Sequence, residues 1–211
     1  HLSIRRQRQM CIRDSSIIPL SFEQNVKAGI TMVCQSKNMS ASDGITSGKT
    51  EKMNSPDYLS GRKILVTGAS GFIGSHLCRQ LLAHDATVNG ISRNPASQNQ
   101  EDVRWWSGDL VDFEFVQKVV NAVKPDIIFH LGSHVAGSRS LDLVLPTFHS
   151  NLASTVNLLT ATTQTGCLRI ILAGSMEEPE NGNGCTVPCS PYAAAKWAGN
   201  GYARMFRTLY Q

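Results

Sequence analysis

A tyrosine and a lysine four residues apart form the most reactive pattern in this chain. Tyr192 and Lys196 lie in "SPYAAAKWAGNGYARMF". On a helix, residues i and i+4 share a face, so the ammonium group would lie beside the phenol. A nearby positive charge lowers the pKa of a phenol and lets it act as an acid or base near neutral pH. Ser175 ends the apolar run "LRIILAGS", and its hydroxyl would complete a catalytic set with Tyr192 and Lys196.

Three glycines earlier in the chain predict a dinucleotide site. Gly68, Gly71 and Gly74 are spaced three apart in "GASGFIG", between the β-branched run "KILVT" and the helical pattern "SHLCRQLLAH". The first glycine allows the tight turn, the second lets the backbone approach a pyrophosphate, and the third lets the helix pack closely on the strand. The unpaired N–H groups of the helix N-terminus then face the phosphates.

The identity of the dinucleotide depends on the end of the next strand, expected at 87–92. An NAD site usually has an acidic residue there for the adenosine ribose, but this chain reads Ser92-Arg93-Asn94. Arg93 can pair with a 2′-phosphate, which favours NADP over NAD. The alternative is that Arg93 is a solvated loop residue. Asp109, after the next strand, is placed to reach the adenine.

Strands alternate with helices along this part of the chain, which predicts an α/β fold with a doubly wound parallel sheet. The expected strands are 63–67, 87–92, 103–110, 126–133 and 168–175, and the expected helices follow the glycine motif and cover about 111–124, 149–165 and 191–210. Gly132 and Ser133 leave room for a cofactor at the end of the fourth strand. His130 reads as a packed core residue rather than a catalyst.

Residues 1–60 lack a helical or strand period and are rich in polar residues, so they are expected to be a disordered or artefactual N-terminal extension. "MCIRDS", Met10 to Ser15, resembles the translation of a sequencing-library adapter. The dinucleotide-binding domain is expected at 61–211. The net charge of +4 comes mostly from arginines before Ser15, which gives little reason to propose a nucleic-acid partner.

Six cysteines and the absence of long apolar runs narrow the class of protein further. Cys78 and Cys167 lie in or beside apolar periodic segments and are interpreted as small core residues. Cys185 and Cys189 are four apart but lack a second ligand pair, so no metal is predicted. No run of about 18 apolar residues occurs, so no membrane span is expected. A reducing cytoplasm is the expected compartment.

Several motifs together resemble a known family. "VTGASGFIGSHL", "GDL", "PDIIFHLGS", "NLASTVNLL" and "SPYAAAK" are similar to the extended short-chain dehydrogenase/reductase family, in its NAD-dependent epimerase/dehydratase branch. The resemblance covers about Arg62 to Tyr210. It implies a Rossmann-type fold, an NAD(P) cofactor, and a nucleotide-sugar substrate of which one sugar carbon is transiently oxidised by hydride transfer and then epimerised, dehydrated or reduced.

The resemblance also implies residue roles. Tyr192 would be the acid/base, Lys196 its pKa tuner and ribose anchor, and Ser175 the hydroxyl that holds the reacting oxygen of the substrate. Cofactor contacts are implied for Gly68, Gly71, Phe72, Ile73, Gly74, Arg93, Asp109, Leu110, Leu131, Gly132, Ser133, Asn151, Tyr192 and Lys196. Glu177 falls where sugar dehydratases carry a base, although Met176 departs from the Asp or Ser usual before it. The alternative for Glu177 is a solvated loop acid.

The resemblance has consequences for completeness as well. The family continues with a sixth strand and a smaller domain that selects the substrate, so this chain is interpreted as an N-terminal fragment that is truncated and inactive as written. A homodimer is implied by analogy, through the helices around Leu152–Leu159 and Tyr192. The competing hypothesis is a non-catalytic protein that binds or senses a dinucleotide, against which Ser175, Tyr192 and Lys196 together argue.

Overall fold

The computed structural model describes residues 58–94, 101–136, 138–179 and 187–210, together with two short strands at 12–13 and 30–33. The strands are β1 (Ile12–Arg13), β2 (Ile30–Val33), β3 (Lys63–Thr67), β4 (Thr87–Ser92), β5 (Arg104–Ser107), β6 (Ile127–His130) and β7 (Arg169–Ala173). The helical elements are α1 (Phe72–Ala83), α2 (Phe113–Val123), η2 (Leu141–Leu143), α3 (Val144–Thr147), η3 (Phe148–Ala153), α4 (Ser154–Thr162) and α5 (Pro191–Leu209). Most predicted elements are therefore confirmed, and β3 and β4 have the predicted bounds.

The strands form one sheet in the order β1-β2-β7-β6-β3-β4-β5. The five strands from β7 to β5 run parallel to one another, which confirms the doubly wound, Rossmann-type α/β fold. The strand order reverses at β3, because β4 continues on one side of it and β6 on the other. Such a reversal is where ligands bind in open α/β sheets.

Two strands occur where the sequence predicted none. β2 pairs antiparallel with β7, in register from Ile30 opposite Ala173 to Val33 opposite Ile170, and β1 pairs with β2. An edge strand exposes a row of N–H and C=O groups that a short segment can pair with through its main chain alone. Such pairing needs no side-chain period. Apart from residues 58–60, the rest of the predicted extension lies outside the described residues, as do Cys11, Cys34 and Cys185.

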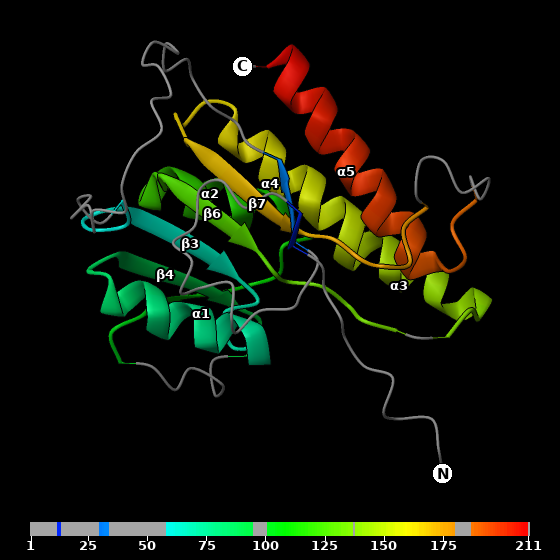
Figure 1. Ribbon diagram of the computed structural model, residues 1–211, viewed down its shortest axis with the longest axis horizontal. Coiled ribbons are helices and arrows are strands. Elements are labelled where there is room, and N and C mark those ends of the chain that lie inside the picture. The colour runs from blue at the N-terminus through cyan, green and yellow to red at the C-terminus, as the bar shows by residue number, and fades with distance from the viewer. Residues whose placement is uncertain are drawn as a thin grey trace, which may run out of the picture.

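Helices cover both faces of the sheet (Figure 1). One core cluster joins buried residues of α1, such as Leu77 and Cys78, to Ile64 and Val66 of β3. The other joins α2, α4 and α5 to the opposite face, around Leu65. Because consecutive strand residues point to opposite faces, the β-branched and leucine run of β3 supplies both cores. Cys78 is fully buried, as predicted.

The helix expected from residue 149 begins earlier and is irregular. α3 starts at Val144, and residues 148–153 form a wider π-helical segment before α4. π-helical turns inside helices occur frequently at functional sites. This segment places Asn151 in the interior, where only 2% of its surface is exposed.

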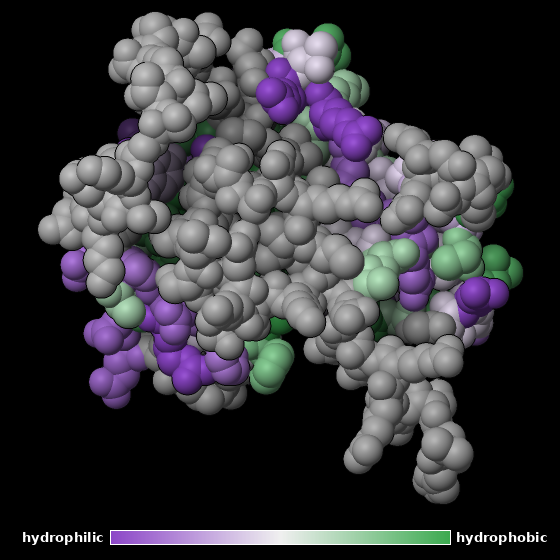
Figure 2. Space-filling model, in the orientation of Figure 1, coloured by the Kyte–Doolittle hydropathy of each residue, from purple (hydrophilic) through white to green (hydrophobic). Residues whose placement is uncertain are grey.

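Apolar surface gathers at the side of the molecule that carries α3 (Figures 1 and 2). Leu141 and Leu145 are strongly exposed there, and Phe148 is partly exposed.

No helix in the described part of the chain combines the length and the apolar character that a membrane span requires.

Candidate functional site

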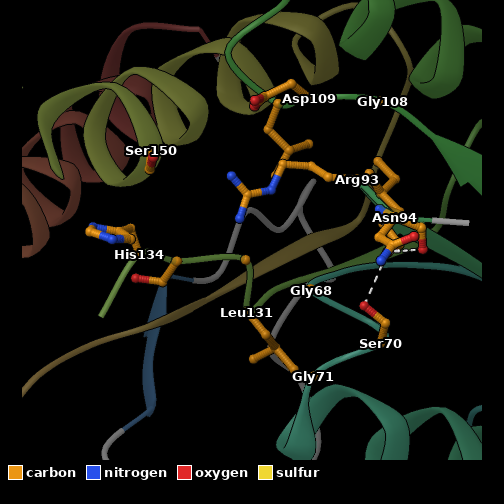
Figure 3. A pocket seen from close by; sticks show the side chains of 15 residues that line it. Gly68, Ser70, Gly71, Arg93, Asn94, Gly108, Asp109, Leu131, His134 and Ser150 are labelled. Atoms are coloured by element: carbon orange, nitrogen blue, oxygen red, sulfur yellow. Dashed lines mark hydrogen bonds between the residues drawn. The ribbon is translucent and has the colours of Figure 1, made fainter. Parts of the chain in front are cut away.

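A cleft of about 310 Å³ lies at the carboxyl ends of the parallel strands, at the reversal of strand order. Its lining comes from the turns and loops that follow β3, β4, β5 and β6, and from the π-helical segment (Figure 3). The lining residues are Gly68, Ser70, Gly71, Ile91, Ser92, Arg93, Asn94, Gly108, Asp109, Leu110, Leu131, Gly132, Ser133, His134 and Ser150. The volume lies at the lower end of the range for small-molecule sites.

The glycine turn forms one wall of this cleft through close backbone packing. Gly68 has a φ of +68°, and a Cβ there would lie 2.7 Å from the backbone nitrogen of Gly132. At Gly74 a Cβ would collide with the carbonyl oxygen of Gly68. A side chain at either position would therefore push apart the turn, the start of α1 and the end of β6.

The N-terminus of α1 is suited to an anion. Gly71 is the N-cap and makes no side-chain capping bond, and the first turn, Phe72–Ser75, carries no acidic residue. Its first amide groups are thus left to backbone contacts or a ligand. Gly71 lines the cleft, whereas Phe72 and Ile73 do not. The cradle of glycine backbone and helix N-terminus fits a pyrophosphate group.

At the other wall, the end of β4 presents Arg93 and Asn94 to the cleft, and the turn after β5 presents Asp109 (Figure 3). Arg93 is exposed. The hydroxyl of Ser92 lies 3.1 Å from that of Ser70, which ties this wall to the glycine turn. Asp109 accepts a hydrogen bond from the backbone N–H of Val111 at 3.1 Å, so its carboxylate has a fixed direction.

Asn151 holds the loop after β6 through both the oxygen and the nitrogen of its side-chain amide. Its Oδ1 accepts from the N–H of His134 at 2.6 Å and from the hydroxyl of Ser133 at 3.1 Å. Its Nδ2 donates to the carbonyl of His134 at 3.0 Å. Asn151 thus acts behind the cleft lining. His134 and Ser150 line the cleft instead, and the Nδ1 atom of His134 is buried with no hydrogen-bond partner among the described residues.

His130 connects the glycine side of the cleft to the helix that carries Asn151. Its Nδ1 lies 2.7 Å from the hydroxyl of Thr67 and its Nε2 lies 3.0 Å from that of Thr155. Thr155 donates to the carbonyl of Asn151, so it accepts from an Nε2–H. With the proton on Nε2, Nδ1 is an acceptor, so Thr67 donates to it while accepting from the N–H of Gly132. One neutral tautomer of His130 satisfies every one of these bonds.

The charge state of His130 agrees with this hydrogen bonding. Burial, and next the positive charge of Lys196, lower the pKa of His130 to about 3. The ring is 2% exposed, so the interpretation of His130 as a packed core residue agrees with its position. It holds the site together and does not line the cleft.

Lys196 lies at the centre of the second group of candidate residues. Its ammonium group donates to the carbonyl of Ala173, the last residue of β7, at 3.0 Å. It also lies 5.8 Å from the centre of the Tyr192 ring. Burial lowers the pKa of Lys196 to about 8, against the opposing effect of Glu178. The i, i+4 spacing thus places the two side chains on one face of α5, as helical geometry requires.

The loop after β7 joins Ser175 to α5 through two glutamates. The hydroxyl of Ser175 accepts from the N–H of Glu177 at 3.1 Å, and the carboxylate of Glu177 accepts from the hydroxyl of Ser190 at 2.7 Å. Ser190 also caps α5 by accepting from the N–H of Ala193. Glu178, which the sequence did not single out, accepts from the N–H of Ser175 at 2.6 Å and from Asn200 at 2.5 Å.

The candidate residues therefore form two groups. The cleft lining includes eight of the expected cofactor residues: Gly68, Gly71, Arg93, Asp109, Leu110, Leu131, Gly132 and Ser133. Phe72, Ile73, Gly74 and Asn151 lie outside the lining, as do the group of Ser175, Glu177, Tyr192 and Lys196. The other seven lining residues were missed: Ser70, Ile91, Ser92, Asn94, Gly108, His134 and Ser150. Their positions at or just after strand ends, or beside Asn151, were the available signal.

Metal ligands do not gather anywhere in the described part of the chain: no three His, Cys, Asp or Glu side chains are placed to share an ion. Burial raises the pKa of the Cys78 and Cys167 thiols to about 11. Both thiols therefore stay protonated at neutral pH and are poor nucleophiles or ligands.

Known proteins are similar to this chain in sequence. A family model described as "NAD dependent epimerase/dehydratase family" matches residues 64–211. UDP-glucose 4-epimerase of Mycolicibacterium smegmatis is 32% identical over 166 residues, which cover 70% of this chain and 52% of that protein. Human GDP-mannose 4,6 dehydratase is 29% identical, over 69% of this chain and 46% of that protein.

A solved structure is similar to this chain in sequence and in fold. UDP-glucose 4-epimerase of Thermus thermophilus, in complex with NAD, is 27% identical and superimposes with a TM-score of 0.58 over 70% of this chain and 51% of that one. The chain spans about half the length of the relatives that it matches. Because the matched residues include the glycine turn, the cleft lining and the Tyr192–Lys196 pair, the chain belongs to the NAD-dependent epimerase/dehydratase family.

Proposed function

We propose that this chain is the dinucleotide-binding part of an NAD(P)-dependent epimerase or dehydratase that acts on a nucleotide sugar. The observation that carries the proposal is the cleft at the reversal of strand order, formed by Gly68, Gly71 and Gly132 in close backbone packing and by the uncapped N-terminus of α1. UDP-glucose epimerases and a GDP-mannose dehydratase among the relatives support a nucleoside diphosphate sugar as the substrate class.

The cofactor proposal assigns each wall of the cleft to one part of the dinucleotide. The glycine turn holds the pyrophosphate, and the wall with Arg93, Asn94 and Asp109 holds the adenosine. Arg93 is the residue that would select NADP, because a guanidinium binds a 2′-phosphate through two parallel hydrogen bonds. The Thermus thermophilus relative is a complex with NAD, so the preference for NADP over NAD rests on Arg93 alone.

The reaction would use the face of α5. A dinucleotide held in the cleft would supply the hydride acceptor and donor for one sugar carbon. Tyr192 removes or returns the proton of the sugar hydroxyl, and the ammonium group of Lys196 favours the ionised phenol. Ser175 donates a hydrogen bond to the reacting oxygen. Glu177 would be the base in a dehydratase, but its carboxylate is engaged with Ser190, so epimerase chemistry needs fewer rearrangements.

Calorimetric titration of the 211-residue chain with NAD and with NADP tests the binding proposal. We expect saturable binding of at least one dinucleotide, and loss of that binding in Gly71→Val, where a side chain at the N-cap would obstruct the phosphate approach. Gly201→Ala serves as the control, because Gly201 lies on α5 with open space around its Cβ position. Failure of both dinucleotides to bind would contradict the proposal.

A second candidate, dinucleotide binding without turnover, has an observation of its own. The cleft is lined by residues of the glycine turn and the strand ends, while Tyr192 and Lys196 do not line it. In the complete enzyme of which this chain is proposed to be a part, reduction of bound dinucleotide by a nucleoside diphosphate hexose, followed spectroscopically, separates the two candidates. A signal that disappears in Tyr192→Phe supports the enzyme, and binding with no signal supports the second candidate.

Self-association is the remaining part of the proposal. Trp197, Tyr202 and Met205 of α5 expose apolar surface, and exposed apolar area of this kind marks interaction sites. Sedimentation analysis of the wild-type chain and of Trp197→Glu would test a homodimer through α4 and α5. A monomer at all concentrations would contradict it.

A further inference from the structure

Glu178 is an acidic side chain whose contacts reach both halves of the candidate catalytic group. One carboxylate oxygen accepts from the backbone N–H of Ser175 at 2.6 Å, and the other accepts from Nδ2 of Asn200 at 2.5 Å. Tyr192, Lys196 and Asn200 follow each other at intervals of four on α5, so they form one stripe on the helix. Glu178 therefore fastens the Ser175 loop directly to the stripe that carries the reactive pair.

The carboxylate of Glu178 also offsets part of the free-energy cost of burying the ammonium group of Lys196. Lys196 is 8% exposed, and its ammonium group makes one hydrogen bond to protein, with the carbonyl of Ala173, among the bonds that the structure records. A buried cation needs a compensating negative charge. Glu178 acts in this sense on Lys196, because it raises the pKa of the ammonium group against the effect of burial.

Glu177, the neighbouring glutamate, makes a different contact. Glu177 is exposed, and its carboxylate accepts from Ser190 at the start of α5. Among the described residues, the titratable groups that interact with Lys196 are His130 on β6, Glu178 on the loop after β7, and Tyr192 on its own helix. Of these three side chains, only Glu178 is a carboxylate.

We propose that Glu178 is a positioning residue: it fixes Ser175 against α5 and supplies the negative charge that keeps the buried Lys196 protonated. The contact itself is a property of this chain, and its meaning for catalysis rests on the function proposed above. Glu178 touches neither the cleft nor the expected reacting atoms, so its effect passes through Ser175 and Lys196.

Glu178→Gln tests the electrostatic half of the proposal. Glutamine has nearly the same shape, its Oε1 can still accept from Ser175, and the Asn200 amide can turn to accept from the new Nε2–H. The charge alone is removed. Titration of the Lys196 side chain in the 211-residue protein, followed by carbon-detected NMR of its Cε, should show its pKa lowered by about one unit. Glu177→Gln is the matched control and should leave that titration unchanged.

Glu178→Ala tests the positional half, because both hydrogen bonds are lost. The Ser175 amide should exchange with solvent at least about tenfold faster than in the wild type, while amides of β3 keep their exchange rates. If β3 exchanges faster as well, the fold has been disturbed, and Glu178→Gln then decides the question alone.

A double variant that moves the carboxylate from position 178 to position 200 of α5 should restore the Lys196 titration. In Glu178→Gln combined with Asn200→Asp, a carboxylate again meets an amide at the same contact, four residues from Lys196. The Lys196 titration should return toward its wild-type position, whereas Asn200→Asp alone places two carboxylates in contact and should lower stability. The double variant then shows a coupling that the single variants do not predict.

Three results would overturn the proposal: an unchanged Lys196 titration in Glu178→Gln, an equal shift in Glu177→Gln, or an unchanged Ser175 exchange rate in Glu178→Ala. Dinucleotide titration of the same samples keeps the two ideas separate. Wild-type protein that binds neither NAD nor NADP refutes the proposed function, whereas the NMR titration and the exchange rates refute or support the role of Glu178.

Discussion

The glycine turn after β3 and the face of α5 both hold functional groups in place, but they are built from different parts of the chain. At the turn, Gly68 and Gly74 bring backbone against backbone, and a single added Cβ would collide. On α5, long side chains reach across to other elements: Lys196 to the carbonyl of Ala173, and Asn200 to Glu178. The first region depends on the absence of side chains, and the second on their charges and reach.

This difference predicts that substitutions will affect the two regions in different ways. A backbone cradle fails through steric overlap, which is felt as lost stability and lost binding together. A side-chain group fails through lost charge or a lost hydrogen bond, which can change chemistry while the fold survives. His130 belongs to both regions, because it bonds Thr67 at the end of β3 and Thr155 on α4, and Lys196 lowers its pKa.

The largest expected effect concerns Tyr192 on the α5 side of the comparison. In the complete enzyme of which this chain is proposed to be the dinucleotide-binding part, Tyr192→Phe removes the phenolic proton while keeping the ring, so turnover of a nucleoside diphosphate hexose should fall by about 10²- to 10⁴-fold. Dinucleotide affinity should change by less than about threefold. Steady-state rates and calorimetric binding constants of wild type and variant check both statements. Parallel loss of binding and turnover would mean that the two regions are not separable.

Gly74→Ala is the matching change on the glycine side. The added Cβ meets the carbonyl oxygen of Gly68 and the backbone of Ala69, so we expect the free energy of unfolding to drop by about 3 kcal/mol. Urea unfolding of the variant gives the value. Gly201→Ala is the control, because Gly201 is an exposed position of α5. It should instead raise the free energy of unfolding by about 0.5–1 kcal/mol. Equal effects at both positions would remove the distinction between the regions.

The pH dependence of stability reports on His130, which lies between the regions. Its folded pKa of about 3 lies below the usual value of 6.5, so the unfolded chain binds the additional proton in that interval. Stability from this group is complete above pH 6.5 and decreases as the pH falls toward 3. Between about pH 7 and pH 5 the loss should be about 2 kcal/mol by urea unfolding, and His130→Gln should lack it. A His130 ring that titrates near about pH 6 by NMR, close to an unperturbed histidine, would contradict this.

Arg93 tests the cleft wall opposite the glycine turn, and its effect should be the smallest. Arg93→Ala should weaken NADP binding by about tenfold, the usual effect of losing a charged hydrogen bond to a phosphate. NAD binding should stay within about twofold, because NAD lacks the 2′-phosphate. Titrations with both dinucleotides decide the question. An equal loss for NAD and NADP would mean that Arg93 contacts the shared part of the two molecules or acts through the fold.

Local patterns in the sequence were sufficient for most of the fold. The β-branched run at Lys63–Thr67, the glycine spacing and the helical pattern of 191–210 act over a few residues, and the strands and helices they predict are present. Strand β2 was not predicted, because pairing at a sheet edge uses main-chain groups that leave no side-chain period. The early start at Val144 and the π-helical segment were also missed, since their geometry is set by packing.

The sequence by itself determined the chemistry that is available: a glycine turn, an arginine at a strand end, and a tyrosine and lysine one helical turn apart. These are properties of neighbouring residues, so they can be identified without the fold. Only the tertiary structure decided which distant groups act on them. Burial of Lys196 against Ala173, the alignment of His130 between two threonines, and the contact of Glu178 with Asn200 all join segments far apart in the chain. Desolvation and hydrogen-bond direction have no local sequence signature, because both depend on what the folded chain places nearby.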